Sequence, residues 1–325
     1  NGGNTRITTS NSGGNTVGAN DSGILGGRNN NIVTGADRSI IIGGTGNQVS
    51  SSGQNSVIQG GIVNRTASQS SGVVAGNFNY AGGQGSFVGG GSINRIQQIA
   101  AYSGIIGGQN NTLSAQRALI LGGTTNEIAA SSNYSVIIGG SGNLINSSSI
   151  NCFINGANNT IANGSDFGVI LGRNNNIGNT FAAGNVKIFG NFNTVNGNSG
   201  QVIIGENNTN NSAYARIFGQ EHTIAAGGPG QSILGGKNNT INSGVVATIV
   251  GGSGNLVITG NFGIIAGGRN NNTTGNYTSL LSSEGCTSAG LGSFKTIIGS
   301  NTCQIEGSHN MILGSNTSSI DVDST

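Results

Sequence analysis

The sequence predicts an all-β fold, namely a parallel β-solenoid (β-roll) of about nineteen coils with roughly 16 residues in each. Three observations predict this class. A short block of apolar residues and glycines recurs along nearly the whole chain, the recurring runs are rich in β-branched residues, and residues that favour helices are scarce. Because glycine and asparagine also weaken helices, a helical fold is not expected.

The repeat consists of two apolar residues, two glycines, an asparagine three residues after the second glycine, and a further apolar residue. Residues 41–44 (IIGG), with Asn47 and Val49 behind them, are one copy. The position of the second glycine recurs nineteen times from Gly27 to Ser315, at an average spacing of 16 residues. Each apolar run is only as long as a strand, so the unit predicts two short strands separated by turns.

Stacking explains why such a short unit recurs. One coil cannot enclose a core, but coils stacked at about 4.8 Å let each strand hydrogen-bond to the copies above and below it. Glycine at the turn position permits a positive φ. We expect a solenoid over residues 23–320, an irregular segment or atypical first coil over 1–22, and a short tail over 321–325. Nineteen coils at this spacing would form a rod about 90 Å long.

An asparagine occupies the same place in fifteen of the nineteen repeats. Asparagine tolerates left-handed conformations, and its amide can bond to the neighbouring coil, so we expect a ladder of stacked side chains. The exceptions are His222, Cys286, Cys303 and Ser318. The ladder residues on which this expectation rests are Asn30, Asn47, Asn64, Asn111, Asn126, Asn143, Asn159, Asn175, Asn239 and Asn255.

Composition and charge exclude several functional classes. The net charge is +2, and the 12 basic residues are scattered singly, whereas a nucleic-acid groove needs clustered cations. No apolar run approaches the length of a membrane helix, so membrane insertion is not expected. Hydrophobic residues reach 34%, which argues against disorder. Glycine runs such as residues 89–91 do not precede a helical pattern, and no metal or cofactor is expected.

Two neighbouring positions before the second glycine are both apolar, which bears on assembly. Adjacent strand residues face opposite sides, so one position fills the interior and the other forms an apolar stripe outside. We therefore expect a homo-oligomer, a trimer or a filament, that covers the stripe. Lys187 and Arg216 are expected to break the stripe, with Phe189 and Phe218 restoring it two residues later. The outward position is taken as the one three residues before the second glycine, where Lys187 and Arg216 stand, and in other coils it holds Ile24, Ile41, Ile105, Ile120, Ile137, Val169, Val202, Ile233 and Ile312. The position after it holds Leu25, Ile42, Ile106, Leu121, Ile138, Ile170, Ile203, Leu234 and Leu313.

The repeat resembles a known family. The cadence of residues 39–44 (SIIIGG), followed by residues 47–49 (NQV), is similar to the head repeats of trimeric autotransporter adhesins of the YadA type, and to viral and phage tail-fibre shafts. The resemblance covers about residues 23–320, although the repeat here is longer and has isoleucine where the family often has alanine. It implies parallel β-rolls assembled around a shared apolar axis on a cell or virion surface, with glycans or a host surface as partners.

Catalytic candidates are few, and we expect a structural or adhesive fibre module rather than an enzyme. Glu206 and Glu221 follow the turn glycines of adjacent coils and could lie close together. A polysaccharide-cleaving tailspike, which would use such a carboxylate pair, is the alternative. Lys237 occupies the matching turn of the next coil, and this favours a solvated ladder of charges.

Three further patterns leave alternatives open. Cys286 and Cys303 replace the ladder asparagine in consecutive coils, so they form either a bonded pair or two buried thiols. Cys152 has no evident partner. Exposed tyrosines could engage glycans: Tyr80, Tyr102, Tyr134 and Tyr277. A rank of threonines could resemble an ice-binding face: Thr194, Thr209, Thr223 and Thr240.

Overall fold

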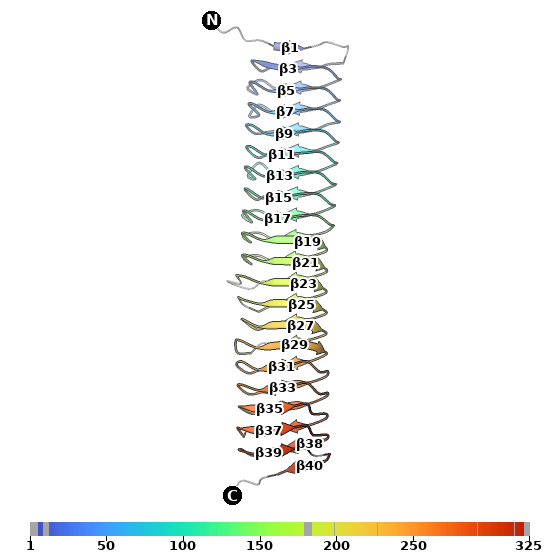
Figure 1. Cartoon of the computed structure of the whole chain (residues 1–325). Helices are drawn as coiled ribbons and strands as arrows, with labels where there is room; N and C mark the ends of the chain where they lie inside the picture. The colour runs from blue at the N-terminus through green and yellow to red at the C-terminus, as the bar shows by residue number, and fades with distance from the viewer. Residues whose placement is uncertain are drawn as a thin grey trace. The chain divides into compact units, whose positions relative to one another are not determined.

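A computed structural model describes residues 6–8, 13–178, 184–197, 199–225, 227–290, 292–314 and 316–321. Two compact units divide the chain, unit 1 over Asn1–Gly168 and unit 2 over Val169–Thr325. In each unit the odd-numbered strands form one parallel sheet and the even-numbered strands form another, and the described residues contain no helix (Figure 1). The prediction of an all-β parallel β-solenoid with coils of about 16 residues is therefore confirmed.

In the part of unit 1 that the structure describes, each sheet has ten strands. The odd-strand sheet comprises β1 (Arg6–Thr8), β3 (Ser22–Ile24), β5 (Ile40–Ile41), β7 (Val57–Ile58), β9 (Gly72–Val73), β11 (Phe87–Val88), β13 (Gly104–Ile105), β15 (Leu119–Ile120), β17 (Val136–Ile137) and β19 (Phe153–Ala157). The even-strand sheet comprises β2 (Thr16–Val17), β4 (Asn31–Ile32), β6 (Gln48–Val49), β8 (Arg65–Thr66), β10 (Tyr80–Ala81), β12 (Arg95–Ile96), β14 (Thr112–Leu113), β16 (Glu127–Ile128), β18 (Leu144–Ile145) and β20 (Thr160–Ile161).

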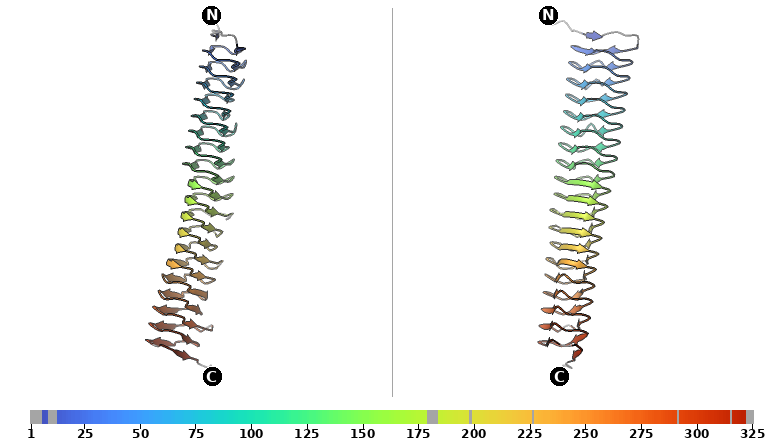
Figure 2. Two further views of the ribbon diagram at one scale, coloured as in Figure 1. Left: turned by 90° about the vertical axis from the view of Figure 1, so that its right-hand side faces the viewer. Right: turned by 45° about the vertical axis from the view of Figure 1, so that its right-hand side comes forward.

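Unit 2 repeats the arrangement, and several of its odd strands are longer (Figure 2). The odd-strand sheet comprises β21 (Val169–Arg173), β23 (Lys187–Asn191), β25 (Val202–Glu206), β27 (Arg216–Gln220), β29 (Ser232–Lys237), β31 (Thr248–Val250), β33 (Ile264–Ala266), β35 (Thr278–Leu281), β37 (Lys295–Ile298) and β39 (Met311–Leu313). The even-strand sheet comprises β22 (Asn176–Ile177), β24 (Thr194–Val195), β26 (Thr209–Asn210), β28 (Thr223–Ile224), β30 (Thr240–Ile241), β32 (Leu256–Thr259), β34 (Asn272–Thr274), β36 (Thr287–Ser288), β38 (Cys303–Ile305) and β40 (Ser318–Ile320).

The interior of each coil is filled by one side chain from each sheet. In the coil of β5 and β6 these are Ile41 and Val49, both with 0% exposure. Ile41 pairs in register with Ile24 in the preceding coil and with Ile58 in the following coil, so identical side chains stack into a continuous column. Each fully buried aliphatic side chain contributes about 1.5–3 kcal/mol. This regular apolar filling is what makes the stack of short strands stable.

The turn after each odd strand requires glycine because successive coils approach closely there. Gly44 has a φ of +87°, and a Cβ added to it would lie 2.2 Å from the carbonyl oxygen of Gly61. Gly43, next to it, has no neighbouring atom within 4 Å of the same added atom. In this pair only the second glycine is therefore demanded by the backbone. In unit 2 the first glycine can also have a positive φ, as Gly235 does at +87°.

The outward column predicted from the sequence is wrong for the coils with two glycines. Their residues three positions before the second glycine are buried in the interior, as Ile41 is, and the next residue, such as Ile42, lies outside. Val169 and Val202 do lie on the outer face, because their coils have one glycine and the count back from it shifts by one residue. The structure absorbs the difference as a bulge in the pairing of β27 with β29, whose partners shift between Phe218 and Gln220.

The same shift corrects the expectation for Lys187 and Arg216. Phe189 and Phe218 do not restore a broken stripe, because they align directly with Ile204 in the outward column. Lys187 and Arg216 belong to a different outward column, two residues earlier on the same face of the odd-strand sheet. Ser315, the last predicted turn position, lies outside the described residues, as do parts of the predicted terminal segments 1–22 and 321–325.

Candidate functional site

The asparagine column forms a hydrogen-bonded ladder inside each unit. The backbone N–H of Asn47 donates to Oδ1 of Asn30 at 3.0 Å, and Nδ2 of Asn47 donates to the carbonyl oxygens of Gly43 at 3.0 Å and Gly61 at 3.1 Å. Each side chain thus bonds to the coil above it and closes its own turn. A buried amide satisfied in this way avoids the cost of an unpaired polar group.

The ladder is continuous within each unit. In unit 1 the N–H to Oδ1 bonds connect every step from Asn15 to Asn159. In unit 2 the corresponding bonds run from Asn175 to Cys303. Asn15 was not among the predicted members, because the glycine that marks the other repeats is absent from its coil. The column has a structural role, since its polar atoms are occupied by the chain itself.

His222 replaces asparagine in the ladder, and it still forms one hydrogen bond to the preceding coil and one to the following coil. Its N–H donates to Oδ1 of Asn208 at 2.9 Å, and its Nδ1 accepts from the N–H of Asn239 at 3.0 Å. Nε2 is enclosed without a well-formed hydrogen bond and faces the carbonyl of Gly236. Burial lowers the pKa of His222. The imidazole is therefore neutral, with its proton on Nε2.

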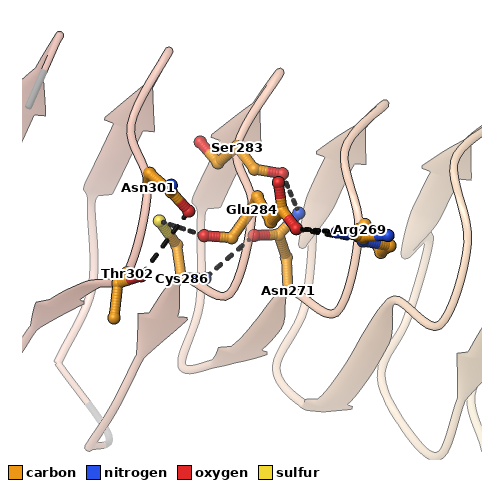
Figure 3. A network of polar contacts seen from close by, with 7 residues as sticks. All are labelled: Arg269, Asn271, Ser283, Glu284, Cys286, Asn301 and Thr302. Carbon is orange, nitrogen blue, oxygen red and sulfur yellow. Dashed lines mark hydrogen bonds and ion pairs between the residues drawn. The ribbon is translucent and has the colours of Figure 1, made fainter. Parts of the chain in front are cut away.

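Cys286 and Cys303 continue the ladder with sulfur in place of the amide. The N–H of Cys286 donates to Oδ1 of Asn271 at 3.0 Å, and the N–H of Cys303 donates to Sγ of Cys286 at 3.3 Å. The two sulfurs are not joined by a disulfide. Figure 3 shows Cys286 beside Asn271, with its thiol directed at the carbonyl of Glu284. Burial raises the pKa of the Cys286 thiol, which disfavours a reactive thiolate.

Cys152 occupies a different interior column, near the start of the odd strands. Its Sγ donates to the carbonyl of Ser165 at 3.0 Å, and its N–H donates to Oγ of Ser135 at 3.1 Å. Burial raises the pKa of the Cys152 thiol to about 12. The thiol thus replaces a serine hydroxyl as a buried donor and has no nucleophilic character at neutral pH.

A polar groove of about 600 Å³ lies on the turns of unit 2. It is lined by backbone and small polar side chains together with Arg269 and Glu284, which form an ion pair between adjacent coils (Figure 3). Both side chains are about half exposed, with 62% and 49% of their surface accessible. An exposed pair of opposite charges neutralises itself and contributes little to stability, so this groove lacks an uncompensated charge for a ligand.

Glu206 and Glu221 lie next to each other in adjacent coils, because the backbone N–H of Glu221 donates to the carbonyl oxygen of Glu206 at 2.9 Å. Glu206 aligns in register with Gln220, one residue before Glu221. Glu221 forms an ion pair with Lys237 at 3.2 Å, and both side chains are about half exposed. The charge of Glu221 is thus compensated by a cation, in keeping with the predicted ladder of charges.

Aromatic residues stack on the exposed turn before the odd strands. In unit 2, Tyr277 lies between Phe262 and Phe294 with ring centroids 5.1 Å and 4.9 Å away, and His309 stacks on Phe294 at 5.1 Å. In unit 1, Arg117 lies over the rings of Tyr102 and Tyr134. These stacks were missed from the sequence, although the spacings of 15 to 17 residues between their members were a usable signal.

Lys295 is an unexpected buried cation. Its side chain has 0% exposure, and Nζ donates to the carbonyl oxygens of Ala289 at 2.5 Å and Gly290 at 3.0 Å. Burial lowers the pKa of this lysine. In the preceding coil the hydroxyl of Thr278 bonds to the equivalent carbonyls of Thr274 and Gly275, so Lys295 performs the same turn-closing role with a longer side chain.

The four threonines of the predicted rank do align in adjacent strands. Thr194, Thr209, Thr223 and Thr240 pair directly in register. The rank is flanked by Asn176 below and Leu256 above, so it remains four residues deep and one column wide. A flat ice-binding array would need several parallel columns, and the neighbouring positions do not supply them.

The described residues offer no group of three His, Cys, Asp or Glu side chains that could hold a metal ion. Within the same residues no helix is present that is long and apolar enough to cross a membrane. Comparison with known proteins adds no identity, because no protein-family model matches the chain and no curated protein matches it.

Proposed function

We propose that the chain is a structural and adhesive module of a surface fibre, in which copies associate through the outer face of the odd-strand sheet. The observation that carries this proposal is a column of ten consecutive apolar side chains in unit 2. We call it the outer apolar column. It contains Leu171, Phe189, Ile204, Phe218, Leu234, Val250, Ala266, Leu281, Ile298 and Leu313.

The exposure of this column supports association with a second copy. Ile204, Leu234 and Val250 each expose 40–44% of their surface, and Leu313 exposes 62%. Ordinary monomers rarely expose a continuous apolar patch of more than a few hundred Å². A regular column is matched best by another regular column, and a second copy of this chain supplies one. A trimer around a shared apolar axis, or a filament, satisfies this condition, and the resemblance to trimeric adhesin heads points in the same direction.

Unit 1 carries a shorter version of the same face. Leu25, Ile42, Ile106, Leu121 and Ile138 expose 39–50% of their surface in its outward column. The turns of both units combine asparagine and serine with exposed aromatic side chains such as Phe78 and Phe262. The module would thus place its outer apolar column against other copies and present its turns on a cell or virion surface, where they attach to glycans or a host.

The oligomeric state of the purified chain tests the proposal. Sedimentation velocity should show a trimer or larger assembly, and Val250→Lys should weaken it at least tenfold because a charge enters the contact. Val246→Lys is the matched control, since Val246 has the same 44% exposure but lies on the turn. A monodisperse monomer for the wild-type chain, or an equal effect of the two substitutions, contradicts the proposal.

A non-catalytic role is the second part of the proposal. Incubation with a panel of polysaccharides should release no new reducing ends, because Lys237 pairs with the carboxylate of Glu221. Release of reducing ends that is abolished by Glu206→Gln would instead support the tailspike alternative.

A further inference from the structure

Two arginines flank one tyrosine on the outer face of the even-strand sheet of unit 1. Tyr80 pairs in register with Arg65 in the preceding coil and with Arg95 in the following coil. The guanidinium carbons lie 5.9 Å and 5.0 Å from the centroid of the tyrosine ring. The ring thus holds both cations in place by cation–π contact, and the stacked strands fix their spacing.

The hydrogen-bond donors of the two guanidinium groups are largely uncommitted. Nε of Arg65 donates to Oγ of Ser50 at 2.8 Å, which orients that guanidinium and leaves its terminal nitrogens without a hydrogen-bond partner among the described residues. Within the part of the chain that the structure describes, neither arginine forms an ion pair. An oriented arginine without an acidic partner is well suited to bind a carboxylate or sulfate through two parallel hydrogen bonds.

The surrounding sequence increases the positive potential. From Asp37 to Glu127 the chain contains no acidic residue between these two, whereas four arginines lie within that stretch: Arg38, Arg65, Arg95 and Arg117. In a chain with 12 basic and 10 acidic residues overall, this is a local imbalance of four positive charges. Such a field attracts anions to this face of unit 1 and raises their rate of association.

The arginines open onto a surface groove of about 520 Å³. Its walls include the amides of Gln97 and Gln98 and the side chain of Ile99, which is 58% exposed. Glu127 lines the far end, two strands beyond Arg95 in the register of the sheet. Amides pair with hydroxyl groups, and an exposed aliphatic side chain can pack on the C–H face of a sugar ring. The groove therefore combines an anion site with the chemistry that binds a polyhydroxylated ring.

We propose that this groove binds an acidic saccharide, with the anionic group on Arg65 and Arg95 and the sugar hydroxyls on Gln97 and Gln98. The inference rests on the proposed adhesive function and names the class of ligand that the surface would recognise. A nucleic acid fits less well, because the two arginines occupy both sides of the Tyr80 ring and leave no aromatic face for a base.

Isothermal titration of the full chain tests this site. The probes are a trigalacturonate, its neutral methyl ester, a sulfated heparin-derived tetrasaccharide and a single-stranded DNA oligonucleotide. The chain should bind one or both acidic saccharides and not the methyl ester, and the tighter of the two identifies carboxylate or sulfate as the preferred group. Arg95→Gln should weaken this binding about tenfold or more. Arg95→Lys should recover only part of the affinity, because lysine keeps the charge but lacks the paired N–H donors of the guanidinium group.

Arg117→Gln is the matched control, because it removes one arginine from the same acid-free stretch at a position outside the groove. It should change the affinity by less than about threefold, as expected for a screened charge at a distance. No binding of either acidic saccharide, equal losses in the two glutamine variants, or tighter binding of DNA would overturn the proposal.

Sedimentation keeps this test separate from that of the assembly. Arg95→Gln should sediment as the wild-type chain does, and a Val250→Lys chain that no longer assembles should still bind the acidic saccharide at this groove. If the dissociated Val250→Lys chain binds the acidic saccharide as the wild-type chain does, the saccharide site is supported independently of the assembly.

Discussion

The backbone N–H of Asn239 donates a hydrogen bond to Nδ1 of His222 at 3.0 Å, and this bond requires a neutral imidazole. Burial lowers the pKa of His222 below its ordinary value of 6.5. Below pH 6.5 the unfolded chain therefore binds more protons at this residue than the folded chain does. Its contribution to stability is complete above pH 6.5 and is lost as the pH falls toward the lowered pKa.

Urea unfolding of the wild-type chain and of His222→Asn between pH 5 and pH 8 measures this effect. The stability difference between the two should grow in favour of His222→Asn as the pH falls below 6.5, because asparagine restores the ladder without a titratable group. His309 is common to both proteins, so it cancels in the comparison. A difference that does not vary with pH would show that His222 keeps its ordinary protonation in the fold.

Adjacent glycines in one turn should respond very differently to alanine. A Cβ on Gly123, whose φ is +92°, would lie 2.0 Å from the carbonyl oxygen of Gly140, whereas a Cβ on Gly122 would have no neighbour within 4 Å. Gly123→Ala should destabilise the fold by on the order of 3 kcal/mol because the coils must separate. Gly122→Ala should remain within about 0.5 kcal/mol of the wild type. Urea midpoints followed by circular dichroism give both values, and equal midpoints would contradict the close approach of the coils.

Removing one rung of the ladder should be costly although no apolar surface is lost. Oδ1 of Asn111 accepts from the N–H of Asn126, and Nδ2 donates to the carbonyl of Gly123. Asn111→Ala leaves these buried groups unpaired, and we expect a loss on the order of 3 kcal/mol. Thr112→Ala, the next residue on the outer face, is the control and should change the stability by less than about 0.5 kcal/mol. Similar values for the two variants would indicate that the ladder contributes little.

All three cysteines should resist labelling in the folded chain. Their exposures are 1% for Cys152, 0% for Cys286 and 3% for Cys303, and burial raises the thiol pKa of Cys152 to about 12. A thiol-reactive disulfide reagent at pH 8 should label fewer than one thiol per chain before unfolding and three after it. Rapid labelling of the native protein would contradict the burial. Two thiols missing after unfolding without reductant would indicate a bond between Cys286 and Cys303.

The sequence alone was sufficient for the coil, because its signal depends on local requirements that recur at every turn. Gly44 is needed for a positive φ, and Asn47 is needed to close the turn and bond to the next coil. Because each coil has the same requirements, glycine and asparagine recur at regular intervals along the sequence.

Three features could not be predicted from the sequence: the face of each apolar residue, the groove on the even-strand sheet and the burial of Lys295. They depend on local differences in coil length and on contacts between coils. The glycine alone did not show which apolar position faces the interior, because Ile41 is buried three residues before its second glycine, whereas Ile170 is buried two residues before its single glycine. The groove beside Arg95 depends on five successive coils together, and its residues are individually unremarkable in sequence. The burial of Lys295 could not be predicted, because no residue near it in the sequence indicates that its Nζ hydrogen-bonds to two carbonyls of a turn.

The rungs of the ladder connect residues separated by 14 to 18 positions, yet the bonds keep nearly constant lengths of 2.9–3.2 Å wherever asparagine provides the acceptor. The number of residues in a coil can therefore vary without a change in the hydrogen bonds between neighbouring coils. Deleting or duplicating one whole coil would preserve every bond above and below the junction. Unequal recombination between near-identical gene segments could thus adjust the number of coils during evolution without a new folding problem at each step.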